Sequence, residues 1–404
     1  MRFPEFNGEW EKCKISDLLD FYSTNSLSWE QLEYDTNAMM NLHYGLIHVG
    51  LPTMIDLAKD KLPNIKEGNM PKNFEMCKEG DVAFADASED TNEVAKTVEF
   101  FNLAGKDIVC GLHTIHGRDN KHKTIVGFKG YAFLSAAFHN QIRRIAQGTK
   151  IYSISTKNFS ECYIGLPSKP EQTKIATLLR LIDERIATQN KIIEKLQSLI
   201  KGLNDNIHKG IKGETVCFSD LGEAYSGLSG KGGDDFGYGE PFITYMNVYQ
   251  NTYISEKDYE LVQIAPNEKQ NSVQYGDALF TLSSETPEEV GIGAVYLGNT
   301  QKLYLNSFCF GIHFYDERVL PQYLAHFISS SSFRRAIYPL AQGSTRFNLQ
   351  KNDFMKMKFL LPSLEKQGHI ANTLDALHCR LANEKSLTEQ YILLKKYLLS
   401  LMFI

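Results

Sequence analysis

The sequence predicts an α+β fold, in which two tandem, pseudo-repeated globular domains are joined and separated by two long antiparallel coiled-coil helices. Three observations predict this fold. One sequence pattern occurs twice at a separation of 195 positions, each copy ends in a long helical periodicity, and short β-prone runs alternate with turn signals before each helix. Two copies of one module indicate pseudo-two-fold symmetry, so we expect a partner that is itself duplicated or two-fold symmetric.

The repeat is clearest from the tripeptide Ala-Gln-Gly, which occurs at 146–148 and at 341–343. The register then holds through three further matches, which are Leu-Pro-Ser at 166–168 and 361–363, Gln172 and Gln367, and Ile-Ala at 175–176 and 370–371. Upstream the offset drifts, to 196 at the Gly-Asp pairs and 203 near the start of each copy. Because the ends are alike and the middles differ, we expect two equivalent scaffolds with two different readout surfaces.

The size of the chain suits two domains of about 150 residues plus long helices. Its hydrophobic content of 43% and charged content of 23% are ordinary for a globular protein. It has no run of 18 apolar residues and no signal-peptide core, so we expect no membrane association. Seven cysteines without a CxxC pair favour reduced thiols and a cytoplasmic location.

Local charge departs from the net charge of −5, which argues against a uniformly basic nucleic-acid binder. The segment 118–150 holds seven Lys and Arg residues but one carboxylate, Asp119. The segment 318–351 holds five Lys and Arg residues and no carboxylate. Each copy thus concentrates positive charge just before its long helix, which is the distribution that a phosphate-contacting face needs.

The first long helix is expected from Ser168 to about His208. A capping box formed by Ser168 and Glu171, with Pro170 in the first turn, marks its start. Its apolar seam falls at Ile175, Leu179, Ile182, Ile186, Ile193, Leu196, Ile200, Leu203 and Ile207. This a/d spacing is typical of coiled-coil packing, and a helix of about 50–60 Å needs a partner along its length.

The second long helix begins with the same spacing, and its seam includes Ile370, Leu374, Leu377, Leu381, Tyr391 and Leu398. Glu384 occupies the seam position that Gln189 occupies in the first helix. Packing the two helices against each other, antiparallel, would bury both seams. We therefore expect globular domains at 1–165 and 211–360, a central spacer helix at 166–210 and a C-terminal spacer helix at 361–404.

The globular halves are expected to be compact, with small twisted sheets. Three β-prone runs are Val109–Leu112, Thr124–Phe128 and Leu303–Phe314, and Gln322–Ile328 reads as a helix. The glycine-rich segment 227–239 lacks the first glycine and the Ser or Thr of a P-loop, so we expect a flexible loop rather than a nucleotide site.

Catalytic, cofactor and metal motifs do not emerge from the sequence. No GxSxG, HExxH or cofactor-binding turn is present, so we expect no catalytic residue and no cofactor. Cys110, His113 and His116 are spaced like metal ligands. However, residues three apart on a strand point to opposite faces and no fourth ligand is evident, so we expect no metal.

The arrangement resembles the specificity subunit of type I restriction-modification enzymes. The resemblance covers the whole chain and rests on the repeated Leu-Pro-Ser and Ile-Ala matches, the paired Gly-Asp motifs at 80–81 and 276–277, and Gly-Ser-Thr-Arg at 343–346. The first copy departs at 148–151, which has no arginine at the place of Arg346, and Lys150 is the candidate substitute. The second copy has Lys366 in the place of Glu171.

The resemblance implies a subunit that does no chemistry itself. Each half would be a target recognition domain that reads one part of a split double-stranded DNA sequence. The helices would set the unread spacer and dock two methyltransferase subunits, and motor-nuclease restriction subunits would join the complex. Base-reading candidates are His113, Arg118, Asn120 and Lys121 in the first half and Lys231, Asn247 and Tyr249 in the second. Phosphate-contacting candidates are Lys123, Arg143, Arg144, Lys150, Arg334, Arg335 and Arg346.

Two other functions stay open at this point. The chain could be a non-catalytic coiled-coil scaffold that recruits two partner copies without reading DNA, which the salt dependence of DNA binding would test. It could also be a nuclease or methyltransferase itself, in which case the chain alone would act on DNA supplied with metal and methyl donor.

Overall fold

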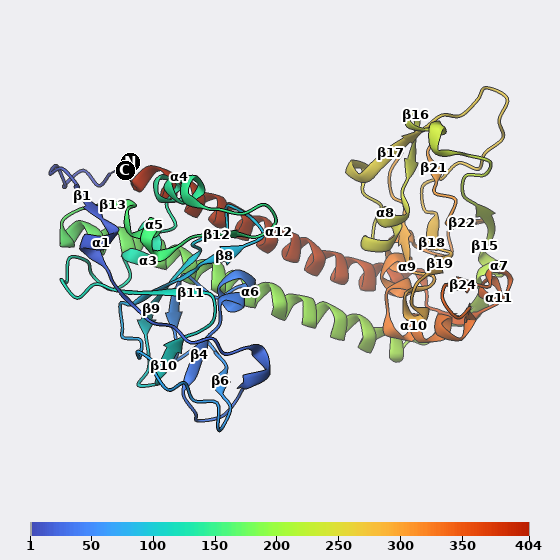
Figure 1. The fold of residues 1–404 in the computed structure, drawn as a ribbon. Helices are drawn as coiled ribbons and strands as arrows, with labels where there is room; N and C mark the ends of the chain where they lie inside the picture. The colour runs from blue at the N-terminus through green and yellow to red at the C-terminus, as the bar shows by residue number, and fades with distance from the viewer. Residues whose placement is uncertain (1, 404) are drawn as a thin grey trace. The chain divides into compact units, whose positions relative to one another are not determined.

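The structure is a computed structural model that describes residues 2–403 (Figure 1). The chain divides into two compact units. Unit 1 comprises Met1–Asn190 and Ser386–Ile404, and unit 2 comprises Lys191–Lys385. Each unit combines small sheets with short helices and with parts of both long helices, so the predicted α+β class is confirmed. No helix within residues 2–403 has the length and apolar character needed to cross a bilayer.

Unit 1 is built on a five-stranded sheet in the order β2 (Asp20–Tyr22), β11 (Thr114–Arg118), β7 (Val82–Ala85), β9 (Thr97–Asn102) and β5 (Met54–Asp56). A second sheet has the order β10 (Ile108–Cys110), β4 (Met40–Leu42), β6 (Asn64–Ile65) and β3 (Leu32–Glu33), and two strand pairs join β1 (Glu11–Lys14) to β13 (Tyr163–Leu166) and β12 (Tyr152–Ser153) to β8 (Ala87–Ser88). The short helices are α1 (Ile15–Leu18), α2 (Tyr44–Val49), α3 (Lys129–Ala132), α4 (Ala136–Ile145) and α5 (Thr156–Ser160).

Unit 2 repeats this plan with a sheet in the order β15 (Gly222–Ser226), β22 (Cys309–Phe314), β18 (Ala278–Thr281) and β20 (Gly293–Val295). A three-stranded sheet has the order β17 (Tyr259–Val262), β16 (Phe236–Ile243) and β21 (Tyr304–Leu305). Another has the order β19 (Ser283–Ser284), β24 (Phe347–Leu349) and β23 (Ala341–Gln342), and β14 (Glu214–Cys217) pairs with β25 (Lys358–Leu361). The short helices are α7 (Phe218–Leu221), α8 (Tyr245–Gln250), α9 (Pro321–Ile328), α10 (Ser331–Ile337) and α11 (Lys351–Met355).

The Gly-Asp motif has the same structural role in both units. Gly80 and Gly276 have φ values of 87° and 89°, in the left-handed region that favours glycine. The aspartate that follows accepts a backbone N–H from three residues before it, at 2.9 Å for Asp81 and 2.8 Å for Asp277. Each motif is therefore a turn that opens a buried central strand, β7 or β18.

The repeated glutamine also has one role in both units. Gln172 is buried, accepts the N–H of Ile125 at 3.0 Å and donates to the carbonyls of Lys123 and Pro167. Gln367 makes the same three bonds in unit 2, to Leu320, Arg318 and Pro362. The prediction of a strand at 124–128 was wrong, because this loop is held to the long helix by side-chain bonds and leads into α3.

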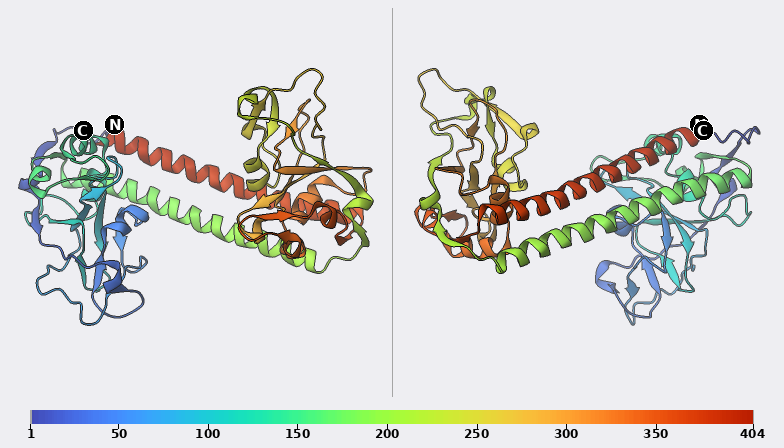
Figure 2. Two further views of the ribbon diagram at one scale, coloured as in Figure 1. Left: turned by 45° about the vertical axis from the view of Figure 1, so that its right-hand side comes forward. Right: turned by 180° about the vertical axis from the view of Figure 1, so that it is seen from behind.

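The two long helices are α6 (Lys169–Lys209) and α12 (Leu364–Met402), and each contributes one half to each unit. In unit 1 the end of α12 runs back along the start of α6 (Figure 2). Lys395 lies 2.6 Å from Asp183, and the Arg185 guanidinium lies 5.8 Å from the Tyr391 ring centroid. Because the residue numbers rise along one helix as they fall along the other, the predicted antiparallel pairing is confirmed in this unit.

The predicted seam residues divide into core and half-buried positions. Ile175, Leu179, Ile182 and Leu398 belong to the main core of unit 1, and Ile370 and Leu374 belong to that of unit 2. Ile186, Ile193, Leu196, Leu377, Leu381 and Tyr391 are half-buried. Gln189 and Glu384, the matched polar seam positions, are both buried. The expected capping box does not use Glu171 as a cap, because its carboxylate bonds Arg2 and Trp10.

Candidate nucleic-acid interface

A groove on unit 1 lies between α2, β8 with the segment after it, the turn between β10 and β11, and the loop after the first Ala-Gln-Gly. We call it the first groove. It is lined by Tyr44, Gly45, His48, Val49, Ala87, Ser88, Glu89, Asp90, Glu93, Lys96, His113 and Ile151. Loop segments and one short helix supply these side chains while the sheets behind them stay buried, which is the usual division between a binding surface and its scaffold.

Unit 2 has a groove of its own, which we call the second groove. It is lined by Tyr245, Met246, Tyr249, Ser283, Ser284, Glu285, Glu289, Phe308, Thr345 and Arg346. These residues come from α8, the segment from β19 onward, the turn between β21 and β22, and the loop after the second Ala-Gln-Gly. Those four segments are the counterparts of the ones that line the first groove.

The repeat register aligns the two grooves position by position. Tyr44 and Tyr245 each follow the residue that caps the helix, His43 or Thr244. The β-turns that carry His113 and Phe308 begin at equivalent backbone bonds, from Gly111 to Leu42 and from Asn306 to Ile243. The same offset that matches the Ala-Gln-Gly tripeptides also matches His113 with Phe308 and Ile151 with Arg346.

The linings combine shared and different side chains. Both grooves carry a tyrosine at the helix start, a serine with a following glutamate, and a second glutamate four residues later. They differ where His48 is replaced by Tyr249, His113 by Phe308 and Ile151 by Arg346. One scaffold with two linings fits two sites that recognise different ligands of one chemical kind.

The first groove is set by two histidines and a tyrosine. The His113 backbone has a φ of 55°, its ring meets Tyr44 edge-on at 5.1 Å, and its Nδ1 lies 3.2 Å from Asp86. His48 Nε2 lies 3.0 Å from the carbonyl oxygen of Ala87. The His113 side chain is half exposed, so the groove presents an aromatic and hydrogen-bonding edge.

The second groove is more aromatic. Tyr245 and Tyr249 stack at 6.0 Å, and the Arg346 guanidinium lies 5.4 Å from the Phe308 ring centroid. The Tyr249 hydroxyl donates to Glu289 at 2.7 Å. This bond, with those from Thr286 and Ser284, lowers the pKa of Glu289, so the groove keeps an ionised acceptor at neutral pH. Aromatic faces, a guanidinium and a carboxylate suit contacts to base edges.

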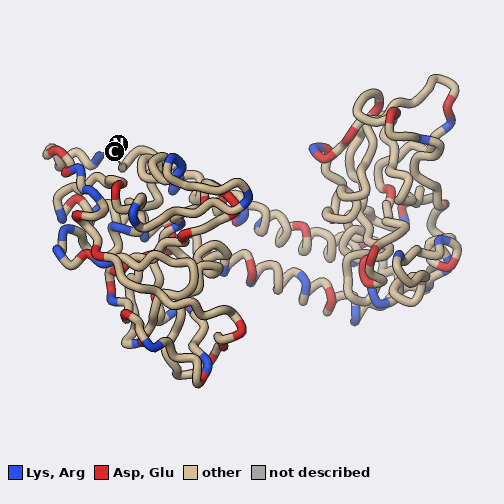
Figure 3. Tube along the Cα trace, in the orientation of Figure 1, with Lys and Arg blue, Asp and Glu red and all other residues tan. Residues whose placement is uncertain are grey.

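Six of the ten predicted Lys and Arg residues have exposed side chains, and Lys121 is one of them. Arg143, Arg144 and Lys150 are exposed in unit 1, as are Arg335 and Arg346 in unit 2. Figure 3 shows positive and negative residues interspersed through both units. Arg334 instead donates to the carbonyls of Glu288, Val290 and Gly291, so its guanidinium holds a loop.

Arg118 lies in the interior and does not reach a surface. Its guanidinium bonds Asp81 and Glu75, with the closest contacts at 2.8 Å and 2.6 Å, and its side chain is 8% exposed. The clustered positive charge around Arg118 is thus partly neutralised by carboxylates from distant sequence. This burial does not favour the predicted base contact.

Asn120, Lys121 and Lys123 lie beyond one end of β11, whereas His113 lies just before the other end. The three are exposed or half-exposed, but each bonds its own unit: Asn120 bonds Asp20 and Tyr22, Lys121 the carbonyl of Asp17, and Lys123 Glu11. They lie close to His113 in the sequence, but the length of β11 separates them from it in the folded chain.

In unit 2, Tyr249 lies in the second groove, but Lys231 and Asn247 do not. Lys231 pairs with Glu268 at 2.6 Å and its side chain is 8% exposed. Asn247 is 2% exposed and bonds the backbone of Ser255 in both directions. The segment 227–239 contains a 3-10 turn at Gly233–Asp235 and the first residues of β16, and its Lys231 is held by the ion pair with Glu268.

Sequence reasoning missed most of the groove lining. Tyr44, His48 and Ile151 in unit 1 and Tyr245 and Phe308 in unit 2 were not among the candidates. The repeat carried a signal for them, since Ser88-Glu89 matches Ser284-Glu285 and both pairs line a groove. Basic residues were favoured instead, and many of these form internal ion pairs.

Comparison with known proteins agrees with the duplicated plan. Residues 60–198 and 213–390 both match the family of the type I restriction modification DNA specificity domain. The chain belongs to this family. Its two matched segments correspond to the two copies of the repeat, so the family resemblance noted from the sequence is confirmed.

A curated relative matches part of the chain, and the fold of solved structures matches nearly all of it. The EcoKI specificity subunit of Escherichia coli (strain K12) is 24% identical over 279 residues, which are 62% of this chain and 58% of that protein. The fold is similar to the S subunit of the type I restriction-modification system from M. genitalium, with 14% identity, a TM-score of 0.53, and coverage of 100% of this chain and 97% of that one. A second solved chain, from work on assembly and conformational transition of the type I R-M system, gives 14% identity, a TM-score of 0.62, and 98% and 97% coverage.

Proposed function

We propose that this chain is the non-catalytic, sequence-specific DNA-binding subunit of a type I restriction-modification complex. In this proposal the target recognition domains, at 1–165 and 211–360, each read one part of a bipartite double-stranded DNA site. The observation that carries the proposal is the pair of grooves, which occupy equivalent positions of a duplicated scaffold and differ in their lining. A bipartite site with unlike halves requires such a pair.

The groove chemistry supports base readout. His113 and His48 offer imidazole nitrogens, and Arg346 offers a planar guanidinium of the kind that bonds guanine edges. Glu285 and Glu289 offer acceptors of the kind that bond the cytosine amino group. Phosphate contacts are assigned to Arg143, Arg144, Lys150 and Arg335, with further cations supplied by the partners, because the chain has a net charge of −5.

The long helices at 166–210 and 361–404 are proposed to fix the spacer and to dock two methyltransferase subunits, which motor-nuclease restriction subunits then join. Exposed apolar side chains on α12 support the docking role. Ile392, Leu393, Leu394 and Tyr397 are all exposed, and Leu393 and Tyr397 are 64% and 59% exposed. An apolar cluster of this kind on a helix surface marks a protein interaction site.

The test uses a matched pair of exposed positions, His113→Ala in the first groove and Phe308→Ala in the second. Cells that carry the full complex are grown with each variant, and their methylated genomic DNA is sequenced. We expect each substitution to relax one part of the recognised sequence and to leave the other part unchanged, with about a tenfold loss of affinity for that part.

Two controls accompany this test. Asn120→Ala and Lys257→Ala remove exposed side chains outside the grooves and should leave the recognised sequence intact. Binding by the purified complex should also weaken steeply as salt rises. A recognised sequence that neither groove variant changes, together with binding that does not respond to salt, would favour the scaffold function without DNA readout.

A further inference from the structure

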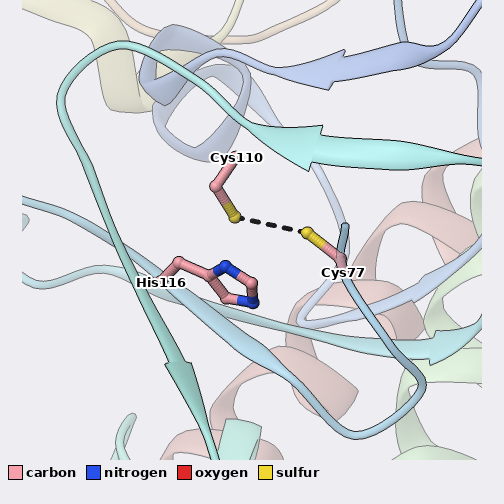
Figure 4. A group of neighbouring side chains, drawn as sticks. All are labelled: Cys77, Cys110 and His116. Atoms are coloured by element: carbon pink, nitrogen blue, oxygen red, sulfur yellow. Dashed lines mark hydrogen bonds between the residues drawn. The ribbon is translucent and has the colours of Figure 1, made fainter. Parts of the chain in front are cut away.

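Three chemically reactive side chains meet in the interior of unit 1, away from both grooves (Figure 4). Cys77 precedes β7, Cys110 ends β10 and His116 lies in the middle of β11. They are 5%, 2% and 0% exposed, and their ligand atoms all lie within 4.8 Å of one another. The two sulfur atoms are 3.5 Å apart.

The His116 ring is oriented by a carboxylate. Its Nε2 lies 2.7 Å from Asp81 Oδ2, so this nitrogen carries the proton that bonds the carboxylate. Its Nδ1 is buried and has no hydrogen-bond partner among the described residues. A buried nitrogen without a partner is unfavourable, and a metal ion bound by the neighbouring thiols would satisfy it. Figure 4 shows the imidazole facing the two thiols.

Unit 2 contains the same scaffold without this cluster. The N–H of Cys77 bonds the carbonyl of Ile108, and the N–H of Val273 makes the equivalent bond to Leu303, so Val273 takes the place of Cys77. Two residues farther along each bonded strand, Leu305 takes the place of Cys110. Both replacements are apolar and buried.

The histidine is replaced as well. His116 pairs with Ala83 in β7 and Tyr22 in β2, and Gly311 pairs with the equivalent Leu279 and Tyr225. A Cβ atom at Gly311 would lie 2.1 Å from Tyr225 Cζ, so the tyrosine ring fills the space that His116 uses in unit 1.

The buried aspartate is kept in both units. The Tyr225 hydroxyl donates to Asp277 at 2.7 Å, as His116 does to Asp81. Unit 2 shows that the fold closes well with valine, leucine and glycine at the three positions. The fold therefore does not require two thiols and an imidazole, yet unit 1 carries all three together.

We propose that Cys77, Cys110 and His116 bind a zinc ion through two thiolates and Nδ1. Tetrahedral zinc with Zn–S bonds of about 2.3 Å places two sulfur atoms about 3.8 Å apart, near the observed separation, whereas a disulfide needs about 2.05 Å. Soft sulfur ligands with an imidazole favour zinc over magnesium or calcium. These side chains supply three of the four ligands of a tetrahedral site.

Protons and charges balance when this site binds zinc. Binding deprotonates both thiols and releases two protons to solvent, and the two thiolates neutralise the divalent ion. Asp81 holds the histidine by its other nitrogen, an arrangement typical of zinc-binding histidines. The Asp81 charge is in turn matched by Arg118. The interior therefore carries no uncompensated charge when zinc is bound.

The position of the site gives it a structural role. It joins β10, which belongs to the four-stranded sheet, to β11, which belongs to the five-stranded sheet. The turn between these strands carries His113, and β4, the neighbour of β10, leads to Tyr44. Zinc would thus fix two sides of the first groove, with no counterpart in the second.

The test measures metal content of the full chain. The protein is purified under reducing conditions without chelator, loaded with zinc chloride and desalted. Its zinc content is then measured by inductively coupled plasma mass spectrometry. We expect about one zinc ion per chain. The variant Cys77→Val/Cys110→Leu, which carries the residues of unit 2, should bind almost none. Cys162→Ala, which removes another buried thiol of unit 1, should retain the zinc.

Cobalt substitution gives a second readout that depends on no variant. Cobalt(II) in the wild-type chain should give the intense visible bands of a tetrahedral site and thiolate charge-transfer bands in the near ultraviolet. A wild-type chain that takes up no zinc or cobalt, a double variant that retains the metal, or a Cys77–Cys110 disulfide in the purified protein would overturn the proposal.

Discussion

Asp81 and Asp277 occupy the same place in two copies of one turn, but their partners differ. Asp81 bonds His116 and Arg118, and Asp277 bonds Tyr225 and His313. Each set satisfies a carboxylate that is almost fully buried. At the residue scale the duplication thus preserved a buried acceptor and allowed its donors to change, while both oxygens of each carboxylate kept a donor.

Arg118 provides a prediction at this scale. Arg118→Met should lower the free energy of unfolding of unit 1 by about 3–5 kcal/mol, because the substitution leaves the buried Asp81 carboxylate without its cation. Urea denaturation measures this change. The folded variant should bind DNA as the wild type does.

Asn120→Ala serves as the matched control for the Arg118→Met variant. It lies two residues away and is exposed. Its loss removes hydrogen bonds to Asp20 and Tyr22, so the free energy of unfolding should change by only about 1 kcal/mol. If Arg118→Met instead left stability unchanged and abolished DNA binding, the base contact predicted from the sequence would be right and the structural role wrong.

At the scale of elements, each long helix changes surroundings along its length. The first part of α6 packs into the core of unit 1, and Leu203 and Ile207 near its end pack against the core of unit 2. The heptad seam is therefore shared between helix pairing and domain cores. Its apolar side chains stabilise the chain itself and leave only outward-facing residues for partners.

We expect two histidines, near the end of α6 and in α9, to make the stability of unit 2 sensitive to acid. Burial lowers the pKa of both His208 and His326. His208 Nδ1 lies 2.8 Å from the carbonyl of Asn204, while its Nε2 is buried without a partner. Protonation would therefore place a charge among the Tyr323 and Phe327 rings, 5.6 Å and 5.5 Å away.

The direction of the pH effect follows from this lowered pKa. Below about pH 6.5 the unfolded chain binds a proton that folded His208 still excludes, so stability is full above pH 6.5 and declines as the pH falls. The slope is at most about 1.4 kcal/mol per pH unit for each histidine. His208→Phe should make the free energy of unfolding depend less steeply on pH, as measured by urea denaturation between about pH 7 and pH 5. The exposed His369→Gln should not, and equal slopes for wild type and His208→Phe would contradict the assignment.

The exposed face of α12 gives a prediction about assembly. Leu393→Ser with Tyr397→Ser removes the two most exposed large apolar side chains among residues 386–403. Affinity for the methyltransferase subunit should fall at least about tenfold, since apolar and aromatic anchors dominate interface energies. Titration with the purified partner measures it. Gln390→Ala, exposed on the same helix, should assemble normally; unchanged affinity of the double variant would exclude this face.

At the scale of the whole molecule, each copy of the repeat ends in a long helix. Each of these two helices belongs partly to unit 1 and partly to unit 2. The proposed spacer function can be tested by inserting four residues after Asn190 in α6 and four after Lys385 in α12, the positions where the units divide. Each insertion lengthens a helix by about 6 Å. We expect the unread spacer to grow by about one or two base pairs, with both half-sequences unchanged.

Sequencing of methylated genomic DNA reads both quantities at once. The matched control inserts four residues into the exposed turn at 266–269 of unit 2, outside the helices and the second groove. This insertion should leave the spacer as it is. A spacer that stays the same after the helix insertions would show that the helices do not measure it.

The sequence by itself determined the repeat, the α+β class, the two long helices and the family. These follow from periodicity and from register, which are properties of local order along the chain. The repeated Gly-Asp, Gln and Leu-Pro-Ser matches proved to be turns and helix–loop bonds that both units need. The helix at Pro321–Ile328 was also confirmed, because its apolar period is strong over its whole length.

Only the tertiary structure decided which polar side chains are held by internal partners and which are exposed. Arg118, Lys231 and Arg334 were candidates by charge, but carboxylates and carbonyls from 37 or more positions away neutralise or bind them. The sequence singled out Cys110 and His116 but rejected a metal site, because Cys77 lies 33 positions from Cys110 and reaches it only through strand packing. A linear spacing rule carries no information about such long-range contacts, whereas burial and pairing in the folded chain settle which groups are left for function.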